Sequence, residues 1–446
     1  MRTTQNDKTQ ASSSSNPSRR RFGQALGAAT TLGAIGGLAA CATSAPAPME
    51  SAKKLGRVLV VGAGFGGATA AKYLKLWGGP GLEVMLVDRQ REFISCPMSN
   101  LVLGGSRSMA DITVSYEGLR RQGVIVANDE VLNIDAAKRR ASFNKLADQS
   151  FDHVIVSPGV DFEYSTVQGF DAEAQKKILT AWKAGPETLA LRAQLEAMPD
   201  GGVYVLSIPT APYRCPPGPY ERACQIAYYF KNNKPRSKVI ILDANPDIVS
   251  KAGLFKKAFN ETYKGMIEYR PNSKVTELDA ASMTVTTELG DKIKGGVLNV
   301  LPQMSAGQIA RNAGLINANN RWCAVDWITM ESTVAKGVHV LGDATLSAAL
   351  MPKSGHMANQ HGKTAAAAIV EMLNGRQPTP SMMANTCYSF IDNSNVVHVA
   401  SVHRYVAEKK TMEVVAGASG LSTEANALEG VYANAWAKNI WNDMLA

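Results

Sequence analysis

Residues 57–67 read Arg57-Val58-Leu59-Val60-Val61-Gly62-Ala63-Gly64-Phe65-Gly66-Gly67, a short apolar segment followed at once by a glycine-rich loop. Residues 68–77 then read as a helix, and residues 82–88 as a second strand. In this order, Gly62 allows a tight turn and Gly64 lets a pyrophosphate approach the backbone. Gly67 permits close packing of helix on strand, and the helix N-terminus stabilises the anion. We therefore predict a dinucleotide site.

Asp88 completes this dinucleotide site, and two later segments select FAD as the dinucleotide. Asp88 ends the second strand, where a carboxylate can accept hydrogen bonds from ribose hydroxyls. The segment Gly337-Val338-His339-Val340-Leu341-Gly342-Asp343 resembles the second FAD signature of flavoproteins with two dinucleotide-binding domains. By that resemblance, Asp343 contacts the sugar alcohol of the flavin. Ser157-Pro158-Gly159 resembles a third, weaker FAD signature, so we expect FAD at this site.

The hydrophobic pattern predicts an α/β fold with two Rossmann-like dinucleotide-binding domains and a C-terminal α+β domain. We expect the FAD-binding domain at residues 56–168 and 297–376, with the second Rossmann-like domain inserted at residues 169–296. A linker, Gln377-Pro378-Thr379-Pro380, opens the C-terminal domain at residues 377–446, which we expect to form an interface with the flavin and a partner. Further strands are expected at 151–157, 202–208, 238–243, 296–301 and 337–341.

The second Rossmann-like domain lacks the glycine fingerprint of a nicotinamide site. Its first strand runs into Pro209-Thr210-Ala211-Pro212-Tyr213-Arg214-Cys215-Pro216-Pro217-Gly218-Pro219. Prolines have no amide hydrogen to bind a pyrophosphate, and this segment contains a single glycine. We infer that a nicotinamide is not the electron partner.

The first fifty residues predict export rather than a folded domain. Ser18-Arg19-Arg20-Arg21-Phe22 is a twin-arginine pattern, and an apolar run rich in glycine and alanine follows at residues 25–40. Leu38-Ala39-Ala40-Cys41 resembles a lipobox. Cys41 is therefore either lipidated, which would attach the protein to a membrane, or removed by cleavage near residues 45–47. Both alternatives predict a periplasmic protein.

Composition and cysteine spacing narrow the classes of function. The formal charge is +9, but no basic stripe with interleaved aromatic residues is present, so we do not expect nucleic-acid binding. None of the six cysteines has the spacing of a haem or zinc motif, and we expect no metal site. An exported, oxidising environment favours a disulfide among the five that follow Cys41. These are Cys96, Cys215, Cys224, Cys323 and Cys387.

Four stretches resemble the flavoprotein subunit of flavocytochrome c sulfide dehydrogenase, whose domains are glutathione-reductase-like. They are Phe93-Ile94-Ser95-Cys96-Pro97-Met98-Ser99-Asn100, Tyr213-Arg214-Cys215-Pro216-Pro217-Gly218-Pro219-Tyr220-Glu221, Met351-Pro352-Lys353-Ser354-Gly355-His356 and Asn385-Thr386-Cys387-Tyr388-Ser389. The similarity extends from about residue 56 to the end of the chain. The stretches that contain cysteine are far more specific than the glycine loop.

This resemblance implies roles for five side chains. Cys96 would form a thioether with the 8α-methyl carbon of FAD, with a buried structural cysteine as the alternative. Cys215 and Cys387 would form a redox disulfide against the flavin ring, although a purely structural disulfide stays open. Glu221 matches a position near this site and is our candidate proton acceptor, unless it is a surface residue without a role. Lys353 would place positive charge near the flavin N1–O2 edge.

The implied activity is sulfide oxidation. Hydrosulfide can attack a disulfide sulfur, leaving a persulfide on one cysteine and a thiolate on the other. The two electrons on a flavin must leave one at a time, as to a haem. The sequence has no haem motif, so we expect a c-type cytochrome on a separate chain, bound as a heterodimer. Two alternatives stay open: a sulfide:quinone oxidoreductase, and an exported flavin-binding scaffold that catalyses nothing.

Overall fold

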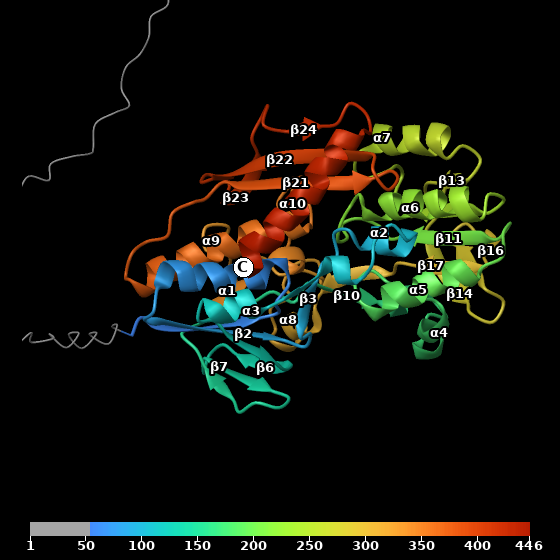
Figure 1. Cartoon of the computed structure of the whole chain (residues 1–446). Helices are drawn as coiled ribbons and strands as arrows, with labels where there is room; N and C mark the ends of the chain where they lie inside the picture. The colour runs from blue at the N-terminus through green and yellow to red at the C-terminus, as the bar shows by residue number, and fades with distance from the viewer. Residues whose placement is uncertain (1–53) are drawn as a thin grey trace, which may run out of the picture. The chain divides into compact units, whose positions relative to one another are not determined.

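The strand before the glycine loop, β1 (Gly56–Val61), lies inside a six-stranded sheet in the computed structural model, which describes residues 54–446 (Figure 1). The strand order is β19-β20-β9-β1-β2-β5, and all neighbours are parallel except β19 and β20. Residues 58–60 are almost fully buried, as expected for a parallel strand covered on both faces. The other strands are β2 (Leu82–Asp88), β5 (Ile125–Asn128), β9 (His153–Val156), β19 (Glu331–Ser332) and β20 (Ala335–Val340).

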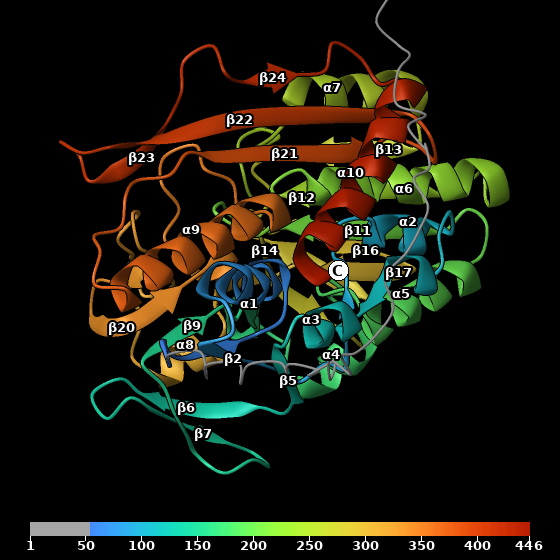
Figure 2. The same ribbon diagram turned by 60° about the vertical axis from the view of Figure 1, so that its left-hand side comes forward.

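Helix α1 (Phe65–Gly78) connects β1 to β2, which confirms the predicted strand–helix–strand unit. It packs beside α9 (Gly355–Leu373), and Figures 1 and 2 show the two helices on the same face of the sheet. A Cβ atom on Gly362 would lie 2.5 Å from the carbonyl oxygen of Gly66, so this glycine lets the two backbones approach. Below the sheet in Figure 1 lies a small antiparallel sheet, β6 (Val131–Asp135), β7 (Arg140–Phe143) and β8 (Gln149–Ser150).

A second sheet, with strand order β13-β12-β11-β17, is parallel throughout. Its strands are β11 (Val203–Ile208), β12 (Lys238–Asp243), β13 (Ile267–Arg270) and β17 (Val297–Val300), and α6 (Gly218–Asn233) connects β11 to β12. Since β17 pairs with β11, the strand at residues 297–300 belongs to the second sheet. The prediction that the first domain resumes at about residue 297 therefore begins one strand too early. The apolar composition of residues 297–300 is compatible with either sheet. Only the pairing of β17 with β11, far away in sequence, assigns the strand to the second sheet.

Shorter elements connect and flank these sheets. In the first half of the chain they are β3 (Glu92–Ile94), α2 (Ser99–Gly104), β4 (Thr113–Ser115), α3 (Glu117–Arg121), β10 (Val160–Glu163), α4 (Ala172–Lys177) and α5 (Pro186–Ala197). Later elements are α7 (Ala252–Lys257), β14 (Val275–Asp279), β15 (Thr284–Thr287), β16 (Lys292–Lys294), β18 (Gln303–Ala306) and α8 (Gln308–Asn312). Strand β10 pairs with β18, which returns the chain to the first domain.

The C-terminal region is an antiparallel sheet followed by one long helix. The sheet contains β21 (Met383–Phe390), β22 (Val396–Val406), β23 (Thr411–Val414) and β24 (Gly420–Leu421), and the helix is α10 (Ala427–Leu445). The end of α10 docks on the first domain, where Tyr73 donates a hydrogen bond to Asp443 at 2.6 Å and Lys363 pairs with the same carboxylate at 2.9 Å. Figure 2 shows α10 crossing from the C-terminal sheet toward α1 and α3.

Two predictions fall on residues that the structure does not describe. The twin-arginine pattern and Cys41 precede residue 54, so export and lipidation stay predictions. Within residues 54–446, none of the helices combines the length and the apolar character that a membrane crossing requires.

Candidate functional site

A cavity of about 470 Å³ lies where the glycine loop, the loop before α6 and strand β21 meet. Its volume is within the range of small-molecule and cofactor sites. Nine of the eleven predicted site residues border it, and they come from all three regions of the chain. They are Gly62, Gly64, Asp88, Cys96, Gly159, Cys215, Glu221, Asp343 and Cys387. Gly67 and Lys353 do not border the cavity.

The glycine loop has the geometry of a phosphate-binding turn. Gly62 has φ +92°, and a Cβ there would lie 2.3 Å from the carbonyl oxygen of Ser157. A Cβ on Gly67 would lie 1.8 Å from the Gly62 carbonyl oxygen, so Gly67 serves the packing of helix on strand. Gly64 borders open space, with no atom within 4 Å of a Cβ built there. The first and last glycines therefore shape the loop, and the middle one leaves room for a ligand.

Asp88 holds this loop from the end of β2. One carboxylate oxygen accepts a hydrogen bond from the Ala63 amide at 2.6 Å, and the other accepts from the Gln90 amide at 2.7 Å. Each carboxylate oxygen has a second lone pair, so both can still accept ribose hydroxyls at the cavity.

Three side chains at the cavity each have a buried polar atom that lacks a hydrogen-bond partner among the described residues. The atoms are Oδ1 of Asp343, Nη2 of Arg214 and Oγ of Ser389. Leaving a buried polar atom unpaired costs about 1–3 kcal/mol, so such atoms indicate a missing polar ligand. The carboxylate oxygen can accept from a sugar hydroxyl, and the guanidinium can donate to a phosphate or carbonyl oxygen. Hydroxyl and phosphate groups are both present in FAD, and these residues therefore fit it.

Lys353 is predicted to place positive charge near the flavin edge, and its side chain does not border the cavity. Its Nζ atom donates hydrogen bonds to the carbonyl oxygens of Asp343 and Thr345 and lies 3.7 Å from the centre of the Trp322 ring. Burial lowers the pKa of Lys353 to about 7. These hydrogen bonds hold the backbone next to Asp343, which borders the cavity. Arg214 borders the cavity with a buried, unpaired donor.

Cys96 lies on the loop between β3 and α2, at the wall of the cavity. Its carbonyl oxygen accepts hydrogen bonds from the amide and the hydroxyl of Ser99, at 3.1 and 2.7 Å. The Ala184 amide points at its sulfur at 3.5 Å. The thiol is partly accessible and held in place, as covalent attachment of a cofactor requires.

Cys215 and Cys387 come from distant segments and border the same cavity. Cys215 has φ +60°, uncommon for a residue other than glycine, and its amide donates to the Lys353 carbonyl oxygen at 2.8 Å. Burial raises the pKa of the Cys215 thiol, and the nearby Cys387 and Glu221 raise it further. All five described cysteines are thiols in this structure, and Cys224 and Cys323 are buried away from the cavity.

Glu221 lies in the first turn of α6, and only 8% of it is exposed. One carboxylate oxygen accepts from the Phe390 amide at 2.9 Å and the other from the Asn100 side chain at 2.8 Å. Burial raises the pKa of Glu221 above the ordinary value of a glutamate, although these hydrogen bonds act in the opposite direction. Its burial excludes the surface alternative, and its raised pKa suits a proton acceptor.

In the second domain, tyrosine side chains surround the acidic residue at the end of the second strand. Asp243 ends β12, in the position that corresponds to Asp88. It is fully buried and accepts hydrogen bonds from the hydroxyls of Tyr220 and Tyr269, at 2.7 and 3.0 Å. Tyr213 is also buried there. The acidic residue that would hold a ribose is therefore bound to tyrosines.

Comparison with known families agrees with this site. Residues 188–302 match the family model "Sulfide dehydrogenase [flavocytochrome c] flavoprotein chain, central", and residues 378–445 match "Flavocytochrome c sulphide dehydrogenase, flavin-binding". A sulfide dehydrogenase [flavocytochrome c] flavoprotein chain from Chlorobaculum thiosulfatiphilum is 52% identical over 46 residues, which cover 94% of that sequence and 10% of this one. The chain belongs to this flavoprotein family.

Other relatives of this family member share its fold. Residues 56–189 match the family model "Pyridine nucleotide-disulphide oxidoreductase". The mitochondrial sulfide:quinone oxidoreductase of Dictyostelium discoideum is 21% identical over 302 residues, 66% of each chain. The structure of the Aquifex aeolicus sulfide:quinone oxidoreductase aligns with a TM-score of 0.70 and 17% identity, over 87% of this chain and 91% of that one. These matches confirm the predicted α/β fold with two dinucleotide-binding domains.

Sequence reasoning missed two cations near the cysteines of this family member. Arg214 directly precedes Cys215, but no pattern indicates that its guanidinium is buried and unpaired. Lys251 is far from both cysteines in sequence, yet its Nζ atom donates a hydrogen bond to the Cys387 carbonyl oxygen at 2.9 Å. It resembles a surface lysine in sequence, and only its 6% exposure identifies it.

Proposed function

We propose that this chain is an FAD-dependent sulfide dehydrogenase that passes electrons to a c-type cytochrome on a separate chain. The observation that carries the proposal is the meeting of Cys215 and Cys387 at one cavity with the FAD-type glycine loop. Membership of the flavocytochrome c sulfide dehydrogenase family supports the choice of sulfide.

The sulfur chemistry begins from a disulfide between Cys215 and Cys387. Hydrosulfide attacks one sulfur, so a new S–S bond forms as the old one breaks, leaving a persulfide and a thiolate. Glu221 accepts the proton of the incoming sulfur, for which its burial and raised pKa suit it. When bound, FAD would supply a two-electron acceptor for the reduced cysteine pair and a donor that gives up its electrons one at a time. Arg214 and Asp343 would hold that cofactor.

The covalent link and the location of the protein complete the proposal. Cys96 would bind the flavin through a thioether, which would prevent loss of the cofactor after export. The twin-arginine pattern supports delivery to the periplasm in a folded state, with Cys41 either lipidated or removed. The intact mass and the visible spectrum of the purified protein show whether flavin is bound covalently, whether the N-terminal segment is removed, and whether Cys41 is lipidated.

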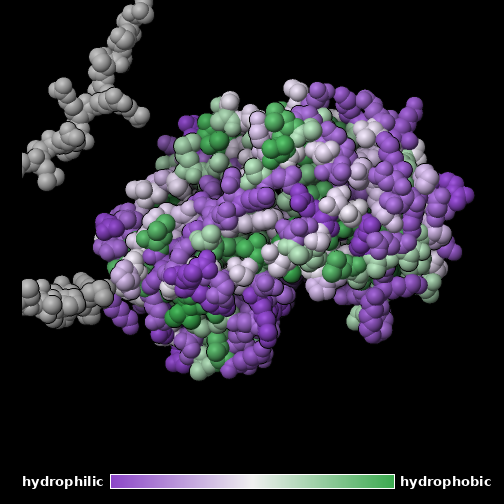
Figure 3. Space-filling model, viewed as in Figure 1, coloured by the Kyte–Doolittle hydropathy of each residue, from purple (hydrophilic) through white to green (hydrophobic). Residues whose placement is uncertain are grey.

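We place the cytochrome partner on the C-terminal region. Figure 3 shows apolar side chains gathered over β24 and the beginning of α10, on a face that is otherwise mainly hydrophilic. Leu421, Leu428 and Val431 are all more than half exposed there. Exposed apolar groups of this kind mark surfaces that bind other proteins. Together with the flavoprotein, this partner would form a heterodimer.

A sulfide:quinone oxidoreductase is the second candidate function, because relatives with that name match two thirds of the chain. The two functions differ only in the electron acceptor. The purified protein, reduced by sulfide, is mixed with cytochrome c or with a short-chain quinone. Faster turnover with the quinone would favour this second function.

Sulfide-dependent bleaching of the flavin absorbance tests the main proposal. Cys215→Ser should keep FAD and lose bleaching by sulfide, because the disulfide no longer exists. Cys224→Ala removes a buried thiol from the same helix region without touching the cavity and should bleach normally. Bleaching of Cys215→Ser at the unmodified rate would exclude the disulfide mechanism and leave a flavin-binding scaffold.

A further inference from the structure

Lys251 occupies an unusual place for a lysine. It precedes α7 with φ +57°, a left-handed conformation that is uncommon outside glycine, asparagine and aspartate. Its carbonyl oxygen accepts hydrogen bonds from the amides of Leu254 and Phe255, both at 3.1 Å. Only 6% of the residue is exposed. The backbone therefore holds this side chain in one direction, into the protein.

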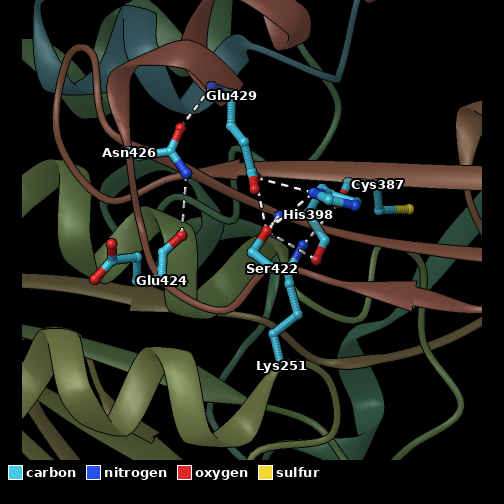
Figure 4. A network of polar contacts seen from close by, with 7 residues as sticks. All are labelled: Lys251, Cys387, His398, Ser422, Glu424, Asn426 and Glu429. Atoms are coloured by element: carbon cyan, nitrogen blue, oxygen red, sulfur yellow. Dashed lines mark hydrogen bonds and ion pairs between the residues drawn. The ribbon is translucent and has the colours of Figure 1, made fainter. Parts of the chain in front are cut away.

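The ammonium group of Lys251 connects the second domain to the strand that carries Cys387. Its Nζ atom donates to the Cys387 carbonyl oxygen at 2.9 Å, and Figure 4 shows the side chain reaching this strand. Lys256 of the adjacent helix is exposed and pairs with Asp247 at 2.7 Å. Lys251, in contrast, has no ion-pair partner within residues 54–446. A buried cation without a counter-ion is costly, because burial disfavours its charged form.

Four groups near Lys251 are potential anions. They are Cys387 on β21, Glu221 on α6, Cys215 before α6 and Glu429 on α10. Burial lowers the pKa of Lys251, whereas these groups raise it, with Cys387 contributing the largest opposing effect. Among these residues, Cys387 is the one that the ammonium group contacts directly, through its carbonyl oxygen.

Glu429 is engaged with other groups. Its carboxylate accepts a hydrogen bond from the Ser422 hydroxyl at 2.6 Å and contacts His398 Nδ1 at 2.9 Å. Figure 4 shows this carboxylate between the two side chains. Glu429 therefore has its own donors, and it leaves the positive charge of Lys251 available to the cysteines.

The sulfur chemistry needs such a charge. Hydrosulfide carries one negative charge into a buried site, and after the S–S exchange that charge rests on a cysteine sulfur. Burial raises the pKa of Cys215, whereas Arg214 and Lys251 lower it. Arg214 borders the cofactor cavity and Lys251 does not, so the two cations act on the pair from different places.

We propose that Lys251 is a positioning residue that holds the backbone of Cys387 and supplies the positive charge beside which the anionic sulfur of the cysteine pair forms. This inference rests on the proposed sulfide chemistry. It assigns no bond to Lys251 in the reaction, only the stabilisation of a charge that sulfide itself brings.

Three variants test this assignment. Lys251→Gln keeps a donor for the Cys387 carbonyl oxygen without the charge, Lys251→Met removes both, and Lys251→Arg keeps the charge. Lys256→Met is the control, since it removes an exposed lysine from the adjacent helix. Removing a buried unpaired charge does not by itself destabilise a fold, so all variants should be obtainable.

The first measurement does not require sulfide. In the holoenzyme with its cysteine pair reduced, alkylation by iodoacetamide is followed against pH by mass spectrometry. Lys251→Gln and Lys251→Met should need a pH about one unit higher for the same rate, a tenfold loss of thiolate. Lys251→Arg and Lys256→Met should follow the unmodified protein. Unchanged profiles in both the Gln and Met variants would overturn the proposal, and if Met misfolds, the Gln–Arg difference decides alone.

The second measurement is the rate of flavin bleaching by sulfide at neutral pH. Lys251→Gln and Lys251→Met should bleach about tenfold more slowly, in step with the lost thiolate. If the unmodified protein does not react with sulfide but the alkylation shift is found, the proposed function fails and the role of Lys251 stands. Normal bleaching in the Gln and Met variants would show that Lys251 has no part in the sulfur chemistry.

Discussion

The loops after β1 and β11 occupy equivalent places in the two parallel sheets, yet they provide different chemistry. The first loop carries the motif glycines 62, 64 and 67 and leaves open space beside Gly64. The second has prolines, one glycine and Cys215, and buried tyrosines occupy the space around Asp243. The same strand–loop–helix geometry therefore binds a cofactor in one domain and presents a sulfur to it in the other.

This difference shows that the fold of a dinucleotide domain and its ligand site depend on different features. The parallel sheet and α6 remain because they depend on buried apolar strands and helix packing. The ligand site depends on backbone amides and open space, and both are absent where prolines and tyrosines stand. Substitutions in each loop test the roles of the two loops separately.

We expect the largest effect from Gly67→Ala in the first loop. Its new Cβ would lie 1.8 Å from the Gly62 carbonyl oxygen, so helix and strand must separate, at a cost of about 3 kcal/mol. Denaturant unfolding and FAD content measure the effect. Gly64→Ala is the matched control, because its Cβ meets no protein atom; it should fold normally and bind FAD more weakly. Equal stability of the two variants would contradict the assigned roles.

Glu221→Gln should slow reduction by sulfide about a hundredfold, as the loss of a general base does. In the unmodified protein the rate should rise with pH as Glu221 loses its proton, above the usual titration range of a glutamate because burial raises its pKa. The variant should lose this rise and keep its FAD. Stopped-flow bleaching across pH measures both. An unchanged pH profile in Glu221→Gln would remove this residue from the reaction.

The two domains should respond to acid in opposite directions. Burial lowers the pKa of His339 on β20 to about 3, so the unfolded chain binds its proton first and stability falls as pH drops below about 6.5. Between about pH 6.5 and 5 this residue alone costs about 2 kcal/mol. In the second domain, burial raises the pKa of Asp243, so protonation there stabilises the fold as pH falls. Hydrogen exchange at mildly acid pH should show β20 opening before β12; the reverse order would contradict this.

The smallest effect is expected from Gly218→Ala in the second loop. The new Cβ would lie 2.8 Å from the Cys215 sulfur and from the Trp182 ring, so the thiol must shift. We expect reduction by sulfide to slow about tenfold, since small misplacements of reacting atoms have effects of this order or larger. FAD content should stay normal, because the first loop is untouched. Loss of FAD instead would show that the two loops are not independent.

Local patterns were enough to predict the first domain and its cofactor. Gly62, Gly64 and Gly67 act through their own backbone and their immediate neighbours, so spacing alone indicates their roles. The FAD signature at residues 337–343 and the segments around Cys96, Cys215 and Cys387 were equally recognisable. Each segment is recognised from residues that are adjacent in sequence, whereas the meeting of Cys215 and Cys387 at one cavity depends on the fold.

Contacts between distant segments explain what could not be predicted. Three features depend on distant partners in this way. They are the pairing of β17 with the second sheet, the backbone contacts of Lys353 and the burial of Lys251. Charge and hydrogen-bond donors are properties of a side chain, and the sequence states them. Burial and the presence of a counter-ion are properties of the surroundings, and they exist only when the chain has folded around the side chain.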